Sequence, residues 1–248
     1  MEKRGQTTLF IILGIVIVAV LVSVFVFRED ISKSVAERKE QTIVSQEPGI
    51  SELQEAVDRC VEKTVKDAVY HVALQGGYFV IPDGYETMSG ITVAYAYKNG
   101  RAMLPSLDKM GDEMALYTAI FMDSCMPSGF PGLELKTGIP KTSVEFNDDT
   151  TVFDLEYSVA AKAGETEYKL RKDYKVALPV RVKKVHQVAQ DVVDMLKRKK
   201  EIDAESLVGK GVDIELQPLE DSNAMWTITD SGSELYGDPL HFVFITKS

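Results

Sequence analysis

The stretch TTLFIILGIVIVAVLVSVFVF, residues 7–27, contains no charged side chain. At 1.5 Å per residue, a helix of this length crosses the roughly 30 Å hydrocarbon core of a bilayer. Lys3 and Arg4 precede the stretch, whereas Arg28, the first basic residue after it, is followed at once by two acidic residues. The positive-inside rule therefore predicts a single-pass protein of the cell membrane, with a cytoplasmic N-terminus and an extracytoplasmic C-terminal domain.

The rest of the chain is expected to divide into a stalk and one domain. We expect residues 1–28 to form the cytoplasmic N-terminus and the transmembrane or signal-anchor helix, residues 29–48 a helical stalk, and residues 49–248 the extracytoplasmic domain. Residues 1–28 contain one acidic and three basic side chains, a net charge of +2, so the remaining residues hold −12 of the formal total of −10. Such an acidic domain argues against nucleic acid as a partner.

Apolar residues with helical spacing predict about three helices in this domain. We expect the first to begin at a capping box of Ser51 and Gln54 and to end at Gly76-Gly77. The second follows Ser106, and its apolar stripe is expected to pack on the first helix; the stripe consists of Met110, Met114, Tyr117, Phe121 and Cys125. The third ends at the basic residues 197–200, next to the negative pole of its dipole. The predicted apolar stripe of the first helix consists of Leu53, Val57, Cys60, Val61, Thr64, Ala68 and Val72.

Alternating apolar residues predict antiparallel strands in the remaining segments. Residues 91–97 and 101–104 flank Asn99-Gly100, the strongest short hairpin signal. Residues 142–182 are expected to form a meander with turns at 147–150 and around Gly164. Three further strands are predicted near the C-terminus, at residues 212–216, 226–228 and 240–245. Helices that interrupt groups of hairpin strands are typical of an α+β fold.

Cys60 and Cys125 are the two cysteines of the chain. Each lies on the apolar stripe of its predicted helix, where the two could meet. A pair of cysteines in an oxidising compartment is usually bridged, so a disulfide is predicted, and two buried free thiols are the alternative.

No catalytic, cofactor-binding or metal-binding residue can be named from the sequence, and we expect a protein that is not an enzyme. The histidines, His71, His186 and His241, lie far apart, and none has a second ligand at the spacing of a zinc site. Two are expected on helix surfaces and one on a face of the last strand. Ser106 and Lys109 have the spacing of a β-lactamase serine motif, but the sequence after them is too short for the other elements that such an active site needs. Ser106 is better explained as a helix N-cap.

Arg4-Gly5-Gln6, followed directly by the apolar stretch, resembles the class III signal peptide of archaeal type IV pilins; the likeness covers about residues 3–27. The resemblance implies that a prepilin peptidase cuts between Gly5 and Gln6. It also implies that the apolar helix stays on the mature subunit and packs with its copies in a filament. Pilins often carry a glutamate five residues into the mature chain, and here that position is Phe10. An uncleaved signal anchor needs no more than a basic flank and an apolar span, so both possibilities stay open.

Three functions are compatible with these features. The first is a membrane-anchored, cell-surface structural protein, namely a pilin-like subunit of a type IV filament. Its partners would be the lipid bilayer, copies of itself through the N-terminal helix, and a prepilin peptidase. The alternative is a signal-anchored binding or assembly domain that does not polymerise. An extracytoplasmic hydrolase comes third, because no nucleophile, base and orienting group can be named.

Overall fold

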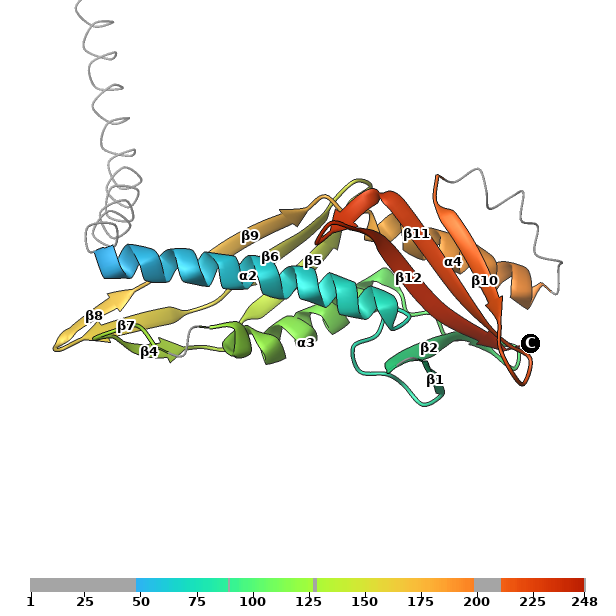
Figure 1. Cartoon of the computed structure of the whole chain (residues 1–248), viewed down its shortest axis with the longest axis horizontal. Helices are drawn as coiled ribbons and strands as arrows, with labels where there is room; N and C mark the ends of the chain where they lie inside the picture. The colour runs from blue at the N-terminus through green and yellow to red at the C-terminus, as the bar shows by residue number, and fades with distance from the viewer. Residues whose placement is uncertain (1–47, 89, 127–128, 199–210, 248) are drawn as a thin grey trace, which may run out of the picture. The chain divides into compact units, whose positions relative to one another are not determined.

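A computed structural model describes residues 48–88, 90–126, 129–198 and 211–247. In these residues the chain forms three helices, α2 (Pro48–Leu74), α3 (Leu107–Cys125) and α4 (Val182–Lys197) (Figure 1). The strands before α4 are β1 (Tyr85–Met88), β2 (Ile91–Lys98), β3 (Arg101–Ala102), β4 (Glu134–Thr137), β5 (Lys141–Phe146), β6 (Thr151–Glu156), β7 (Val159–Ala163), β8 (Thr166–Lys169) and β9 (Asp173–Leu178). Those after α4 are β10 (Asp213–Pro218), β11 (Asn223–Leu235) and β12 (Asp238–Lys247).

The predicted fold class needs a correction. The transmembrane helix predicted within residues 1–28, and residues 29–47 of the predicted stalk, lie outside the described residues. Among the residues that are described, no helix is long and apolar enough to cross a membrane. Even the longest, α2, alternates buried apolar residues with charged ones along its length. The described part of the chain is an α+β domain with three helices and with antiparallel and mixed sheets.

Helix α2 has the predicted buried face but a different start. Every residue of the predicted apolar stripe is buried, which confirms the stripe. The helix begins at Pro48, before the expected capping box, because proline suits the first helical position. The Gln54 side chain, expected to cap the helix, instead donates to Asp58 Oδ1 at 2.7 Å and accepts from the Arg171 backbone N–H at 2.9 Å. Gln54 therefore joins the helix to the strand region beside it.

Strands β5 to β9 form the predicted meander. The turn at Asn147 is closed by its N–H bonding to the Thr150 carbonyl at 2.9 Å, and Gly164 adopts a φ of +59° in the next turn. Strand β6 pairs with β9, and β7 pairs with β8, in one continuous register. The four strands therefore form one long hairpin: β6 and β7 make its first arm, β8 and β9 make its second, and each arm is interrupted between its two strands. The interruption divides the meander into two sheets, β5-β6-β9 and β4-β7-β8.

The largest sheet contains the order β1-β2-β12-β11-β10, and β3 also pairs with β2. The Asn99-Gly100 hairpin joins β2 to β3 as predicted, with φ of +49° and +83° at the two residues. Strand β12 pairs with β2 in parallel, which the prediction of antiparallel strands did not include. Helix α4 packs against β11 and β2 with its valine-rich face buried.

A buried ion pair fixes α4 to β11 where the pairing of β11 with β12 is irregular, between Asp230 and Glu234. Asp230 is fully buried and accepts hydrogen bonds from the Arg181 guanidinium, from Ser233 Oγ at 2.6 Å and from the Gly232 N–H at 3.3 Å. Burial disfavours the charge of Asp230, but these donors outweigh it and hold the pKa of its carboxyl below the usual value. The irregularity is therefore an ordered part of the fold.

Candidate functional site

The disulfide predicted from the two cysteines is present. Cys60 on α2 and Cys125 at the end of α3 are bridged, with Cα atoms 5.5 Å apart. The bridge closes a loop across 65 residues and ties the two helices together. Gly5 and Gln6, the predicted processing site, lie outside the described residues.

The three histidines do not converge on one site. His71 is exposed on α2, as expected, and its ring stacks on Tyr117 at a centroid distance of 5.3 Å. His186 was expected on a helix surface, but it is buried, and its Nε2 lies 2.7 Å from the Pro105 carbonyl oxygen. Burial lowers the pKa of His186, although the bond to Pro105 opposes the shift. His241, on β12, has its Nδ1 2.9 Å from Thr229 Oγ1.

Other groups that could support chemistry have structural partners. Ser106 is the N-cap of α3, since its Oγ accepts from the Lys109 N–H at 3.2 Å, which confirms the N-cap prediction. Within the described residues there is no group of three or more histidine, cysteine, aspartate or glutamate side chains that could hold a metal ion. Ser106 therefore has a structural role, and the described residues contain no such metal-binding cluster.

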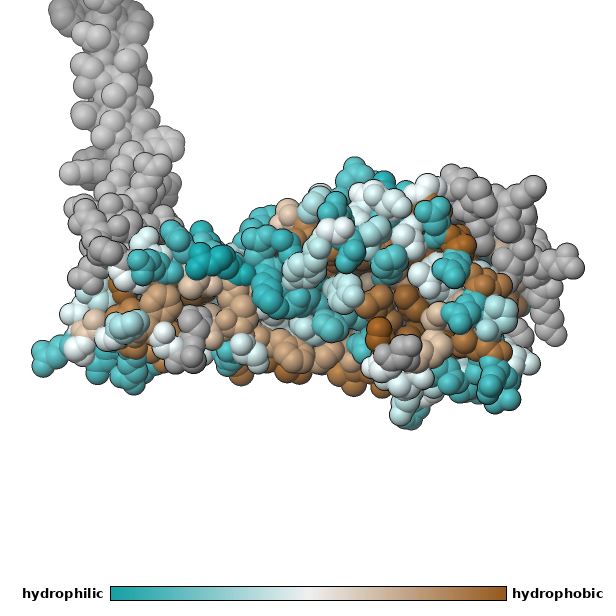
Figure 2. Space-filling model, in the orientation of Figure 1, coloured by the Kyte–Doolittle hydropathy of each residue, from teal (hydrophilic) through white to brown (hydrophobic). Residues whose placement is uncertain are grey.

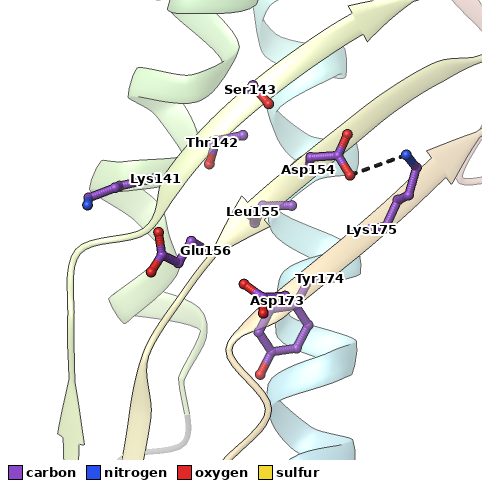
Figure 3. Close-up of a pocket in the computed structure, with 9 residues that line it drawn as sticks. All are labelled: Lys141, Thr142, Ser143, Asp154, Leu155, Glu156, Asp173, Tyr174 and Lys175. Carbon is purple, nitrogen blue, oxygen red and sulfur yellow. Dashed lines mark ion pairs between the residues drawn. The ribbon is translucent and has the colours of Figure 1, made fainter. Parts of the chain in front are cut away.

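A hollow of about 510 Å³ lies over the sheet β5-β6-β9 (Figure 3). In this view α2 and α3 lie behind the sheet, and the labelled side chains come from its three strands. Lys175 Nζ lies 3.4 Å from Asp154 Oδ1, and Lys172 Nζ lies 3.6 Å from Glu156 Oε1, so charges are paired along the strands. The nine lining residues include no histidine or cysteine to activate Ser143. The hollow resembles a solvated sheet face more than a reaction site.

A more distinctive feature is an apolar surface on the end of α2, on the segment that follows it and on α3. We call it the aromatic surface and define it by Tyr70, His71, Phe79, Val80, Leu116, Tyr117, Ile120 and Phe121. Its rings form a connected series: Phe79 packs edge-on against Tyr117 and Phe121, with centroids 5.2 and 5.9 Å apart, and Tyr117 lies 4.5 Å from Phe121. Figure 2 shows hydrophobic side chains gathered along the lower edge of the view, over α3 and the segment before β1.

The turn after α2 places Phe79 and Val80 on this surface. Gly77 has a φ of +89°, and its N–H donates to the Val72 carbonyl at 2.8 Å, a bond typical of a left-handed helix end. A Cβ at this position would lie 2.6 Å from Pro105 Cγ, so glycine is required by both conformation and space. The Tyr78 hydroxyl then donates to the Met103 carbonyl at 2.8 Å. The chain is thereby turned back over α3.

Glu113, on α3, binds the segment that contains Phe79 and Val80. Its side chain is almost fully buried, and Oε2 accepts the backbone N–H groups of Phe79 at 3.0 Å and Val80 at 2.8 Å. Its other oxygen, Oε1, lies 2.7 Å from Lys109 Nζ. Burial disfavours the charge of Glu113, but Lys109 and the two N–H donors outweigh it and keep the pKa of the carboxyl below its usual value. The carboxylate fixes where Phe79 and Val80 lie on α3.

The sequence carried a partial signal for this surface. Tyr117 and Phe121 belong to the predicted apolar stripe of the second helix; Tyr117 is buried as expected, whereas Phe121 is exposed. Leu116 and Ile120 extend the apolar residues of the helix beyond that stripe, and both are exposed. A helix that is apolar on more than its buried face indicates a second contact.

No family model matches the chain, and neither the curated proteins nor the solved structures contain a match to it.

Proposed function

We propose that this chain is a structural protein of the cell surface, a pilin-like subunit of a type IV filament, which displays its disulfide-linked domain outside the cytoplasm. The proposal is carried by the bridge between Cys60 and Cys125. Structural disulfides persist in oxidising compartments and are rare in the cytosol, so the bridge supports an extracytoplasmic domain. The N-terminal Arg4-Gly5-Gln6 and the uncharged stretch after it supply the resemblance to pilins.

The proposed role is non-catalytic, and two features of the described residues support it. The aromatic surface is mainly apolar, and its histidine, His71, is stacked on Tyr117, so contact with another protein surface is the interaction that such area favours. The hollow over β5-β6-β9 offers paired charges on an open sheet face. A structural subunit therefore accounts for these features better than a hydrolase.

The test is the intact mass of the chain extracted from membranes of cells that carry a prepilin peptidase. Loss of Met1 to Gly5 is expected, which leaves Gln6 as the first residue. Gly5→Leu should block the cut, whereas Gly14→Leu, the same change within the apolar stretch, should leave it intact. A full-length chain in the presence of active peptidase would contradict the pilin-like role.

Phe10 favours a second candidate, because it stands where pilins often carry a glutamate. In that case the chain is a signal-anchored binding or assembly domain that does not polymerise. A full-length mass together with retention of the chain in the membrane fraction would support this alternative.

A further inference from the structure

We propose that the aromatic surface binds the same surface of a second copy of this chain. The inference rests on the proposed function, because it requires copies that are held close together by their N-terminal segments. It adds the face of the domain through which neighbouring copies meet.

The exposed area of the aromatic surface is that of a weak contact, which forms only between copies that are held close together. Five of its large side chains are exposed: Tyr70 to 40%, Val80 to 58%, Leu116 to 40%, Ile120 to 52% and Phe121 to 38%. Because a large apolar side chain presents about 150–250 Å² when fully exposed, these five leave on the order of 450 Å² available for contact. A stable interface buries about 800 Å² on each partner, so this surface is too small for a tight dimer in dilute solution. Copies that are tethered side by side reach effective concentrations of about millimolar, at which a weak contact forms.

Charge favours a second copy at this surface and disfavours it elsewhere. Residues 29–248 carry a net charge of −12, so two domains repel each other over most orientations. Two acidic groups that border the aromatic surface are paired: Glu113 with Lys109 at 2.7 Å, and Asp67, which acts on Tyr117, with Lys63 at 2.6 Å. The favoured occupant of this surface is therefore apolar and carries no unpaired acidic group there. The aromatic surface of another copy satisfies both requirements.

The position of the residues suits a twofold contact. In such a contact the same patch is used by both copies, and residues near its centre face their own equivalents. Leu116 and Ile120 are one turn apart on α3, beside Tyr117 and Phe121, and thus form the ridge of the patch. Two α3 helices that cross through this ridge would bring the two Ile120 side chains close together.

The test is site-directed cross-linking of the full-length chain in the membranes of cells that express it. Ile120→Cys is treated with a short bis-maleimide, and Ile139→Cys is the matched control, since Ile139 is more exposed, at 81%, and lies outside the aromatic surface. We expect a cross-linked dimer with Ile120→Cys and little with Ile139→Cys. Peptide mapping checks that Cys60 and Cys125 stay bridged and that the link joins position 120 of two copies.

A second pair of variants tests the contact without relying on the probe. Leu116→Glu in the Ile120→Cys background should abolish the dimer by placing like charges in the contact. Leu216→Glu on β10 is the matched control, because Leu216 is similarly exposed, at 47%, and should leave the dimer unchanged. Both substitutions are at exposed positions, and equal thermal unfolding temperatures would show that both variants are folded.

Several results would overturn the self-contact. One is equal cross-linking at positions 120 and 139, which indicates random collision. Another is a link from position 120 to a cysteine of a different protein. The N-terminal mass separates the two proposals: a processed chain with no dimer refutes the self-contact alone, and an unprocessed chain that forms the dimer refutes the pilin-like role alone.

Discussion

Replacing Glu113 should release the segment that carries Phe79 and Val80 without unfolding the domain. In the native chain one carboxylate oxygen accepts both backbone N–H groups, at 3.0 and 2.8 Å. Glu113→Ala removes this acceptor entirely. Glu113→Gln keeps an oxygen of the same reach but loses the charge that pairs with Lys109. The two variants thus separate the hydrogen bonds from the ion pair.

The expected magnitudes follow from these contacts. A hydrogen bond to a charged group contributes about 1.5–3 kcal/mol, but the exposed Val80 can recover part of this from water, so Glu113→Ala should cost the segment about 2–4 kcal/mol. The ion pair contributes at most about 1 kcal/mol because the Lys109 side chain is half exposed, at 52%, so Glu113→Gln should cost about 1 kcal/mol. Lys109→Met is the control for the ion pair and should cost no more than the glutamine variant.

Amide hydrogen exchange measures this local effect directly. Since 1.4 kcal/mol is a factor of ten, exchange at Phe79 and Val80 should accelerate by about 30- to 700-fold in Glu113→Ala and by about fivefold in Glu113→Gln. Exchange around Trp226, which is buried in β11, should not change. Equal acceleration by the alanine and glutamine variants, or none in either, would refute the assigned role of Glu113.

The same carboxylate makes the segment sensitive to acid. The pKa of Glu113 is lower in the folded chain than its ordinary value of about 4.3, so its stabilising contribution is complete above that value and disappears as the pH falls through the folded pKa. Protection of Phe79 and Val80 should therefore decrease under acid in the native chain. In Glu113→Gln the protection should be lower at neutral pH and should lack this acid-dependent loss.

Three further predictions concern the stability of the domain. Asp230→Ala leaves the Arg181 guanidinium without its buried partner and should lower the free energy of unfolding by about 3–5 kcal/mol in urea titrations, whereas replacing both residues by apolar ones should cost less. Gly77→Ala should destabilise more than Gly90→Ala: both glycines have positive φ, at +89° and +84°, but a new Cβ meets other atoms only at Gly77. An equal loss in the two would show that the close contact is unimportant. Reducing the disulfide should cost about 4 kcal/mol for its 65-residue separation, and unchanged unfolding after complete reduction would contradict this value.

The sequence was sufficient for features that depend on neighbouring residues. The stripe of the first helix, the N-cap at Ser106 and the hairpin at Asn99-Gly100 each rest on local spacing or local conformational preference. In these three cases one segment contains the whole signal. The disulfide joins two segments, and it was predictable because each cysteine lies on the apolar stripe predicted for its own helix.

Features that depend on distant segments were missed. The parallel pairing of β12 with β2 joins strands from opposite ends of the domain, and nothing in either strand specifies the other. His186 was predicted to lie on a helix surface. It is buried instead, because the Pro105 carbonyl, from a distant segment, supplies a hydrogen-bond partner. The capping box predicted at Ser51 and Gln54 was wrong, because the Gln54 side chain has a tertiary contact with Arg171 instead.

The aromatic surface belongs to the second group, since its residues come from α2, the following segment and α3. What makes it suitable for a contact is that α3 is held at three points: Ser106 caps its start, Glu113 joins its middle to the 78–80 segment, and Cys125 ties its end to α2. A surface that is already fixed loses little conformational entropy on binding, so even a small apolar area can contribute to association. Loosening any of the three points should therefore weaken a contact between copies before it unfolds the domain, and the Glu113 variants provide the mildest way to do so.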